Sequence, residues 1–286
     1  MKNHREEFSV ERMAKVLKVS RSGYYAWLRH EPTDRDRRTE TFDAEVNKEF
    51  ALRKGRAGRD TLTAYLRVKG ILCTRKRVGG SMKRQGLTAS RPKRFIATTD
   101  SKHPYRIADN LLQRNFTAPR PDAVWVSDIT YLPCEDGSWL YLTTFIDLFS
   151  RAVVGWNVSG SLKHEYATVP AFKTAALRRG NVRGLVVHSD RGVQYCCDGF
   201  QDTMKLYGCT QSMSKKGDPW DNAVAESFFA TLKRELVGAY RFRNLDDAKT
   251  RLFEYIEIDY NRNRFHSHLG PISPVMFEEA WFRKCA

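Results

Sequence analysis

The sequence predicts an α/β core, a mixed five-stranded sheet with flanking helices, preceded by small all-α segments. Between residues 123 and 213, short apolar runs rich in β-branched residues are separated by turns and by one amphipathic helical stretch. Before residue 88, apolar side chains recur at helical spacing instead. A chain of 286 residues is long enough for one substantial core and a smaller domain or two.

We assign residues 1–53 to an N-terminal helical region. Within it, residues 8–30 predict two short helices separated by a break, where Ser20 can cap the second helix. This pair suits either DNA contact or simple packing, and the sequence favours neither. A charged stretch then leads into a further helix, whose apolar side chains at i, i+4 and i+8 are Phe42, Val46 and Phe50.

A second pair of helices is predicted within residues 54–90, which we assign to a helix-turn-helix-like DNA-binding segment. Arg75, Lys76 and Arg77 open its second helix, where a recognition helix would meet DNA. The pair Gly79-Gly80 follows, and two interior glycines cost a helix about 2 kcal/mol relative to alanine. We therefore expect this helix to be short, kinked or formed only on binding.

Positive charge is concentrated in the first 120 residues, which carry 29 Lys and Arg against 13 Asp and Glu. Residues 121–286 carry 20 of each, so the whole net charge of +16 lies in the N-terminal part. Residues 91–120 share this excess without helical periodicity and predict a basic linker. Such a balance is expected of a surface that neutralises phosphates, with a merely soluble basic face as the alternative.

The predicted core, residues 121–286, has the order of three antiparallel strands, then helix, strand, helix, strand and helix. Three antiparallel strands come first, at 123–134, 138–147 and 152–158. A helix at about 163–179 leads to a fourth strand that starts at residue 185, and the fifth is predicted at 210–213. The last helix is predicted to begin with Asp218 as N-cap and Pro219 as its first residue, and to continue unbroken to Gly238.

These elements place three carboxylates where a ligand site is expected. Asp128 shares the apolar face of the first strand, Asp190 stands at the carboxyl edge of the fourth, and Glu226 lies on the flank of the last helix. The gaps between them are 61 and 35 residues. An acidic group on an apolar strand is costly to bury unless it is paired or bound to metal. For Glu226 taken alone, the alternative is an ordinary glutamate on a solvated helix.

Four further residues are candidates for supporting roles. Lys233 follows the helical carboxylate by two turns on the same flank, where it would contact a phosphate. Asp147 ends the neighbouring strand, and His188 precedes the fourth-strand carboxylate by two residues. Asn222 sits in the first turn of the last helix. Packing is the favoured interpretation of His188, and N-terminal capping explains Asn222 equally well.

At these residues the chain resembles a known family, the second-frame (OrfB) transposases of insertion sequence family three, whose DDE catalytic core is similar to that of retroviral integrases. The Asp, Asp, 35-residue gap, Glu spacing is one part of the resemblance. The other parts span residues 125–278 and are specific when taken together: WVSDITYL, WLYLTTFIDLFSRAVVGW, HSDRGVQY, SMSKKGDPWDNAVAESFFATLKREL and YNRNRFHSHLGPISPVMFE.

The resemblance implies a ribonuclease-H-like fold and an enzyme that cleaves and transfers DNA strands in transposition. It implies catalytic and metal-binding roles for Asp128, Asp190 and Glu226. We expect two Mg²⁺ ions, replaceable by Mn²⁺ and bridged by Asp128, because ions about 3.5–4 Å apart can serve both the attacking and the leaving oxygen. It also implies terminal inverted repeats and target DNA as partners, an upstream-frame product as fusion or partner, and a homo-oligomer on DNA.

Two other functions stay open on the sequence: a nuclease that acts only by hydrolysis, and a DNA-binding regulator with an inactive core. The charged N-terminus and the lack of an apolar run near 18 residues predict a cytoplasmic protein without a membrane span, and the resemblance implies a bacterial, nucleoid-associated one. The six cysteines show no CxxC pattern and predict free thiols. The family pattern at residues 260–277 has no evident chemical role and is expected mainly to pack.

Overall fold

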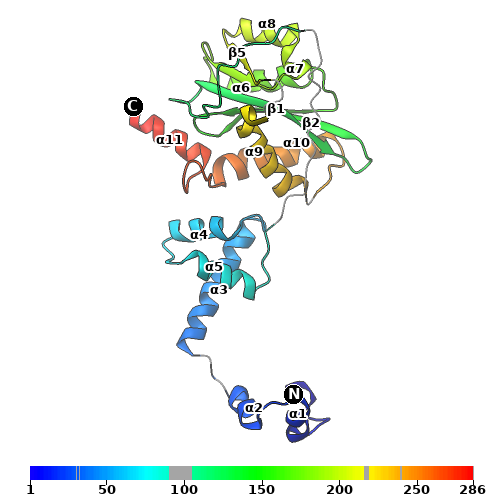
Figure 1. The fold of residues 1–286 in the computed structure, drawn as a ribbon, viewed down its shortest axis with the longest axis vertical. Helices are drawn as coiled ribbons and strands as arrows, with labels where there is room; N and C mark the ends of the chain where they lie inside the picture. Colours follow the sequence, from blue (N-terminus) through cyan, green and yellow to red (C-terminus); the bar gives the residue numbers. More distant parts are fainter. Residues whose placement is uncertain (30, 32, 90–104, 216–218, 239, 286) are drawn as a thin grey trace. The chain divides into compact units, whose positions relative to one another are not determined.

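The computed structural model describes residues 1–286 apart from 30, 32, 90–104, 216–218, 239 and 286. The chain divides into two compact units, Met1–Thr88 and Ala89–Ala286 (Figure 1). The first unit is helical and the second contains the sheet. None of the described helices is long and apolar enough to cross a membrane.

The first unit opens with a pair of short helices. They follow a 3-10 turn, and the three elements are η1 (Lys2–His4), α1 (Val10–Leu17) and α2 (Arg21–Leu28). Ser9 caps α1 and Ser20 caps α2, each by accepting a hydrogen bond from the backbone amide three residues later. The predicted break and the predicted cap at Ser20 are therefore confirmed.

Three further helices share one apolar cluster. They are α3 (Asp34–Leu52), α4 (Arg59–Val68) and α5 (Arg75–Arg84). The buried side chains that join them are Phe42, Val46, Ala57, Leu62, Leu66, Val78 and Met82. The boundary predicted at residue 53 thus falls between helices that have a core in common.

α5 runs unbroken through Gly79 and Gly80, so the expectation of a short or kinked helix is wrong. A Cβ atom at Gly79 would lie 3.1 Å from Cδ of Arg59 on α4, which is tighter than ordinary contact. Glycine at this position leaves room for the Arg59 side chain against α5. Burial of Val78 and Met82 in the shared cluster offsets the propensity cost, because packing supplies most helical stability in proteins.

The second unit is built on a five-stranded sheet with the order β3-β2-β1-β4-β5. The strands are β1 (Val124–Pro133), β2 (Trp139–Asp147), β3 (Val153–Ser159), β4 (Val186–Ser189) and β5 (Thr210–Met213). The first three are antiparallel, whereas β4 runs parallel to β1 and β5 parallel to β4. The predicted mixed sheet is confirmed, with bounds close to those expected.

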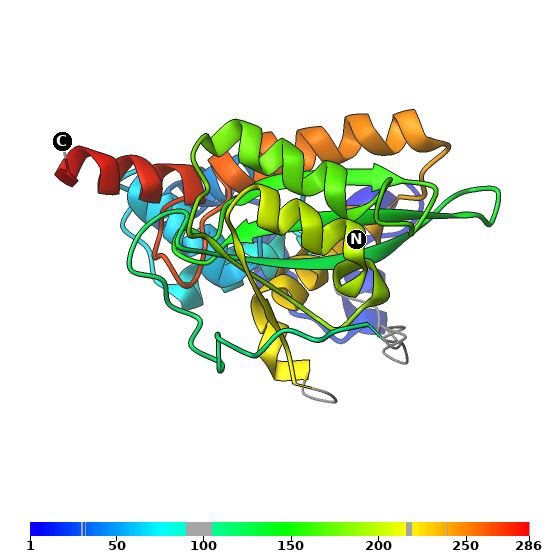
Figure 2. The same cartoon turned by 90° about the horizontal axis from the view of Figure 1, so that it is seen from above.

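Helices cover both faces of this sheet (Figure 1, Figure 2). One face carries α6 (Thr168–Arg179), α7 (Val193–Cys196) and α8 (Asp198–Leu206), and the other carries α9 (Ala223–Leu232) and α10 (Leu245–Phe253). Alternate residues of β1 serve the two faces, with Trp125 in one cluster and Val126 in the other. The chain ends with the π-helical η4 (Glu254–Asn263) and with α11 (Pro274–Cys285).

The helix predicted to start at residue 218 differs from the expectation. A 3-10 turn, η2 (Pro219–Asn222), precedes α9, and a π turn, η3 (Lys233–Val237), follows it. Asn222 takes the N-cap position of α9, while the predicted cap Asp218 lies outside the described residues. Asp221 and Asn222 are buried and bonded to other segments, which holds this first turn in the tighter form.

The predicted linker at 91–120 is described only from residue 105. Residues 105–120 contain no helix or strand, yet they belong to the second unit. Leu112 packs into the core, the Leu111 amide donates to the Ser212 hydroxyl, and the Asn110 side chain donates to Asp221 at 2.9 Å. This part of the chain is therefore fastened to the sheet.

Candidate active site

Asp128 lies in the middle of β1 and Asp190 directly follows β4, both just past the parallel pairing of the two strands. β1 and β4 run parallel with Val126 opposite His188, so each carboxylate stands two residues beyond this pair. Each accepts a hydrogen bond from a nearby backbone amide, at 2.8 and 3.0 Å respectively. The carboxyl ends of parallel strands border the crevice where open α/β sheets bind ligands. The two acids are therefore neighbours in space although 61 residues separate them in sequence.

The pKa of Asp128 is raised well above its usual range. Removal from water is the main cause, and repulsion from Asp190 and Glu226 adds to it. The Ile129 backbone amide and the charge of Lys233 act in the opposite direction. The three predicted carboxylates thus lie within electrostatic range of one another.

Glu226 lies in the first turn of α9 with its side chain exposed. Partial desolvation raises its pKa. The helix is held in place by its opposite face, because the predicted apolar stripe is buried, namely Ala225, Phe228, Phe229 and Leu232. Glu226 therefore projects from a fixed helix within electrostatic range of Asp128.

Asn222 connects this helix to β1. Its side-chain amide donates to the carbonyl oxygen of Ser127 at 3.0 Å, directly before Asp128. Its Oδ1 is buried and accepts no hydrogen bond from any residue that the structure describes. Asn222, for which capping and a supporting role were equally good interpretations, occupies the N-cap position of α9 without a side-chain capping bond and braces β1.

Lys233 lies within electrostatic range of Asp128. Burial lowers its pKa to about 8, while the charge of Asp128 acts in the opposite direction. In turn, the positive charge of Lys233 favours the ionised form of Asp128 and acts to lower the pKa of that carboxyl.

His188 is fully buried behind the acids. Its Nδ1 is 2.9 Å from the Ser212 hydroxyl and its Nε2 is 3.2 Å from the Ser214 hydroxyl. Burial lowers its pKa to about 4, so the ring is neutral at physiological pH. This geometry supports the packing interpretation, in which His188 joins β4 to β5 and the segment after it.

Asp147 belongs to a different part of the unit. Its two carboxylate oxygens accept hydrogen bonds from the backbone amides of Asp122 and Ser150, at 2.7 and 2.8 Å. Burial raises its pKa to about 6, and the acids that raise it further are Glu278 and Asp122, not those of the candidate site. The structure therefore places Asp147 as a brace for the β2–β3 turn.

Two buried residues near the acids were not singled out as functional in the sequence. The Tyr195 hydroxyl is 2.8 Å from that of Ser127. The pKa of Tyr195 is raised well above its usual range by burial and by the charges of Asp128 and Asp190. Asp221 accepts hydrogen bonds from the Lys215 amide and from Asn110. Only the place of Tyr195 within HSDRGVQY hinted at its proximity to Asp190.

The donor chemistry of the site fits a hard divalent cation. Asp128, Asp190 and Glu226 offer carboxylate oxygens, the ligands that Mg²⁺ prefers, and a cation would relieve their mutual repulsion. In the part of the chain that the structure describes, no three Asp, Glu, His or Cys side chains are gathered closely enough to hold a metal ion as they stand. The three acids thus interact electrostatically without forming a closed coordination shell among the described residues.

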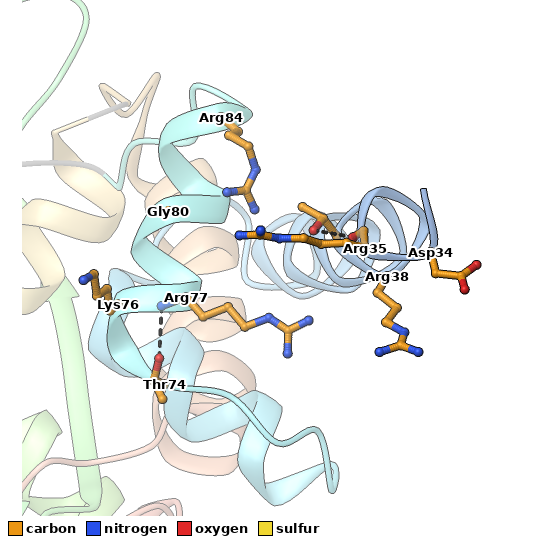
Figure 3. Close-up of a pocket in the computed structure, with 9 residues that line it drawn as sticks. Asp34, Arg35, Arg38, Thr74, Lys76, Arg77, Gly80 and Arg84 are labelled. Atoms are coloured by element: carbon orange, nitrogen blue, oxygen red, sulfur yellow. Dashed lines mark hydrogen bonds between the residues drawn. The ribbon is translucent and has the colours of Figure 1, made fainter. Parts of the chain in front are cut away.

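The predicted DNA-contact residues at the start of α5 are placed differently from one another. Arg75 lies 3.7 Å from Asp60, and the Arg77 guanidinium stacks over the Phe42 ring at 3.9 Å. Lys76 is exposed and lines a basic groove (Figure 3). Arg77 is therefore partly committed to packing.

The C-terminal family pattern packs against the core, as expected. Asn261 bonds to both backbone groups of Val153 on β3 at 2.9 Å. The Tyr260 ring meets Phe228 of α9 edge-on, with centroids 4.8 Å apart. This segment thus supports the helix that carries Glu226.

The chain is similar in sequence to known proteins. A family model described as integrase core domain matches residues 118–219, and a second with the same description matches 207–274. Transposase InsF for insertion sequence IS3A of Escherichia coli strain K12 is 39% identical over 280 residues, 97% of this chain and 96% of its own length. The insertion element IS600 uncharacterized 31 kDa protein of Shigella sonnei is 38% identical over 274 residues, 96% of this chain and 100% of its own.

Two solved structures are similar at lower identity. A chain of the simian T-cell lymphotropic virus intasome, in complex with the PP2A regulatory subunit B56 gamma, has a TM-score of 0.47 and 13% identity, covering 82% of this chain and 74% of that one. The HTLV-2 integrase catalytic core domain in complex with magnesium has a TM-score of 0.44 and 17% identity, covering 56% of this chain and 99% of that one.

Proposed function

The chain belongs to the family of IS3 transposases, and from this premise we propose that it cleaves DNA strands at the ends of an insertion sequence and transfers them to target DNA. The observation that carries the proposal is the placement of Asp128 and Asp190 side by side beyond the paired ends of parallel strands. Glu226 lies within electrostatic range of Asp128, on a helix braced against the same strand. These are the residues that would meet the scissile phosphate.

Asp128, Asp190 and Glu226 are the residues that would hold two Mg²⁺ ions, with Mn²⁺ as a substitute and Asp128 as the shared ligand. The raised pKa of Asp128 supports this assignment, because burial and repulsion from Asp190 and Glu226 outweigh the Ile129 backbone amide and the charge of Lys233. Bound divalent ions activate the attacking oxygen and stabilise the leaving oxygen of a phosphodiester. The residues themselves orient the phosphate and keep three carboxylates available.

Lys233 would hold a phosphate oxygen next to the reacting group. Its half-buried ammonium is near Asp128, and its pKa of about 8 leaves most of it charged at neutral pH. Glu226, with its raised pKa and exposed position, would accept the proton of the attacking hydroxyl. Asn222 would keep Glu226 and Asp128 in fixed relation through its bond to Ser127.

The partners that we propose are the terminal inverted repeats and target DNA, the product of an upstream frame, and further copies of the chain on DNA. The positive charge of the first 120 residues supports DNA as a partner. An upstream product is supported by the absence of sustained heptads from the sequence, which therefore carries no evident coiled coil for pairing two ends.

A strand-transfer assay tests the function. Purified protein is incubated with Mg²⁺, a labelled element end and target DNA, with and without the upstream-frame product. We expect joined products of element end and target. Cleavage that yields only hydrolysed ends under both conditions would instead support the hydrolytic nuclease, and the proposal would be wrong. An Asp128→Asn preparation controls for contaminating nucleases.

A further inference from the structure

We propose that the groove between α3 and α5 holds the sugar-phosphate backbone of duplex DNA, independently of base sequence. This inference rests on the transposase function proposed above and names one part of its DNA interface. The groove has a volume of about 680 Å³ and lies within the first unit (Figure 3). Its walls come from the N-terminal turns of α3 and from the neighbouring face of α5.

The chemistry of the walls selects an anionic, non-stacking ligand. Apart from one glycine, every lining side chain is polar or charged, and five are basic against a single acid, Asp34. Single-stranded nucleic acids bind on aromatic platforms, and peptide anchors need apolar pockets. The groove offers neither. The ligand that fits is the sugar-phosphate backbone of a duplex, whose bases pair with each other outside the groove.

The basic side chains divide into fixed and available groups. Arg84 pairs with Asp43 at 2.7 Å, and Arg77 stacks on Phe42, so these two shape the walls. Arg35 and Arg38 are exposed and form no ion pair with any residue in the described ranges. In Figure 3 the Arg35 side chain extends from α3 toward α5 and the Arg77 side chain extends from α5 toward α3, while Arg38 runs downward from α3.

The first turns of α3 lie outside the apolar cluster of the first unit. The buried residues of this helix are Phe42, Val46 and Glu49, so nothing before residue 42 is buried in the core. Arg35 and Arg38 are three residues apart and share a helix face, where like charges repel. A phosphate between α3 and α5 would relieve that repulsion.

Gly80 forms part of the groove wall. A Cβ atom there would lie 3.5 Å from Nη1 of Arg84, an ordinary contact, so internal packing does not require glycine at this position. At Gly79, by contrast, a Cβ atom would lie 3.1 Å from Cδ of Arg59, so the Arg59 side chain would have to shift by a few tenths of an ångström. Glycine at 80 leaves the helix surface bare, which lets a ligand backbone come close.

The test compares full-length variants on a labelled duplex of random sequence by fluorescence anisotropy over a range of KCl concentrations. Arg35→Gln/Arg38→Gln should lose about tenfold or more in affinity, and its slope of log affinity against log salt should fall by about 1 to 2. Arg37→Gln is the matched control, because Arg37 is exposed on the same helix but does not line the groove. Circular dichroism checks that all variants fold.

Gly80→Leu gives an independent reading, because it fills the groove without changing charge and suits a helix better than glycine. Weaker DNA binding with an undiminished melting temperature supports the inference. If the double variant binds DNA with the affinity and salt slope of Arg37→Gln, the inference is overturned and the groove serves another ligand, such as an acidic protein segment.

Strand transfer by the wild type, measured in parallel, separates this inference from the proposed function. If the wild type transfers strands while the double variant binds normally, only the groove assignment fails. If the wild type transfers no strands while the groove variants lose duplex affinity, the transposase function fails and the groove assignment stands.

Discussion

The side-chain amide of Asn222 donates a hydrogen bond to the carbonyl oxygen of Ser127, the residue that directly precedes Asp128. This single contact joins the N-terminus of α9 to the central strand β1. The spacing between the strand acid and Glu226 therefore depends on a bond that belongs to neither acid. Asn222 is almost fully buried, so water cannot easily replace the bond.

Asn222→Ala should reduce strand cleavage at least tenfold and lower the free energy of unfolding by about 1–3 kcal/mol, because the Ser127 carbonyl loses a buried partner. Asn222→Asp, which keeps the size but cannot donate, should behave alike. Single-turnover cleavage and urea unfolding measure the two effects. The exposed Asn181→Ala is the control. Wild-type cleavage by Asn222→Ala would show that the contact does not set the site.

Asp128→Asn should abolish cleavage while leaving duplex affinity largely intact. Divalent ions should stabilise the wild type by about 2 kcal/mol or more at saturating concentration, because they bind the folded site. The variant should lose this increase in melting temperature. Thermal unfolding with and without Mg²⁺ or Mn²⁺ measures it, with the exposed Asp202→Asn as control. An equal metal-induced shift in Asp128→Asn would contradict the assignment of Asp128 as a ligand.

Much of this site could be predicted from local sequence, but the contacts that complete it could not. Alternation of apolar residues predicted the first three strands, and the apolar stripe of α9 was correct because helical period is a local property. The pairing of β1 with β4, which brings Asp128 beside Asp190, joins distant segments that no periodicity links. The resemblance to a family supplied that connection instead.

The errors have the same origin. α9 begins four residues after the predicted first position because Asp221 and Asn222 bond to other segments, and capping rules consider only neighbours in sequence. Gly79 was taken as a weakness of α5, whereas it permits contact with Arg59 on α4. Asp147 resembled a site residue because it ends a strand, yet its partners are Asp122 and Ser150.

Asp147 should make stability depend on mildly acidic pH. Its folded pKa of about 6 exceeds its ordinary value of 3.8, so the folded state binds the proton more tightly between these values. The stability that this group contributes is therefore present at low pH and is lost as pH rises from about 4 to about 6, by about 3 kcal/mol at most.

The measurement compares unfolding free energies of wild type and Asp147→Asn at pH 4.5 and pH 7. The wild type should exceed the variant by a larger margin at the lower pH, because the variant cannot titrate. At both pH values the variant should be less stable than the wild type. Its side-chain NH₂ group would face the backbone N–H of Asp122, which in the wild type donates a hydrogen bond to the Asp147 carboxylate. If the difference in unfolding free energy between wild type and variant grew with pH, a raised pKa of Asp147 in the folded state would be contradicted. Asp202→Asn should show no such trend.

Lys233→Met should raise the DNA concentration needed for half-maximal cleavage severalfold without raising the Mg²⁺ requirement. The lysine carries positive charge beside Asp128, so its removal takes away a phosphate contact but no metal ligand. Lys233→Arg should restore part of the activity. Titrations of DNA and of Mg²⁺ separate the two constants. A rise in the Mg²⁺ requirement as large as that of Glu226→Gln would place Lys233 within the metal site itself.

The isolated chain should cleave element ends with little preference for their sequence. The basic groove that we propose contacts backbone, which is the same for every duplex, and Arg77 at the start of α5 is drawn into packing on Phe42. The sequence also lacks sustained heptads with which two copies could pair two ends. Addition of the upstream-frame product, as a fusion or in trans, should therefore raise cleavage at matched terminal repeats about tenfold or more over scrambled ones, since an intact specific site is favoured by at least about 4 kcal/mol in typical DNA-binding proteins. Cleavage of matched and scrambled repeats, with and without that product, measures the gain. Strong preference for matched ends by these 286 residues alone would show that end recognition is already built into this chain.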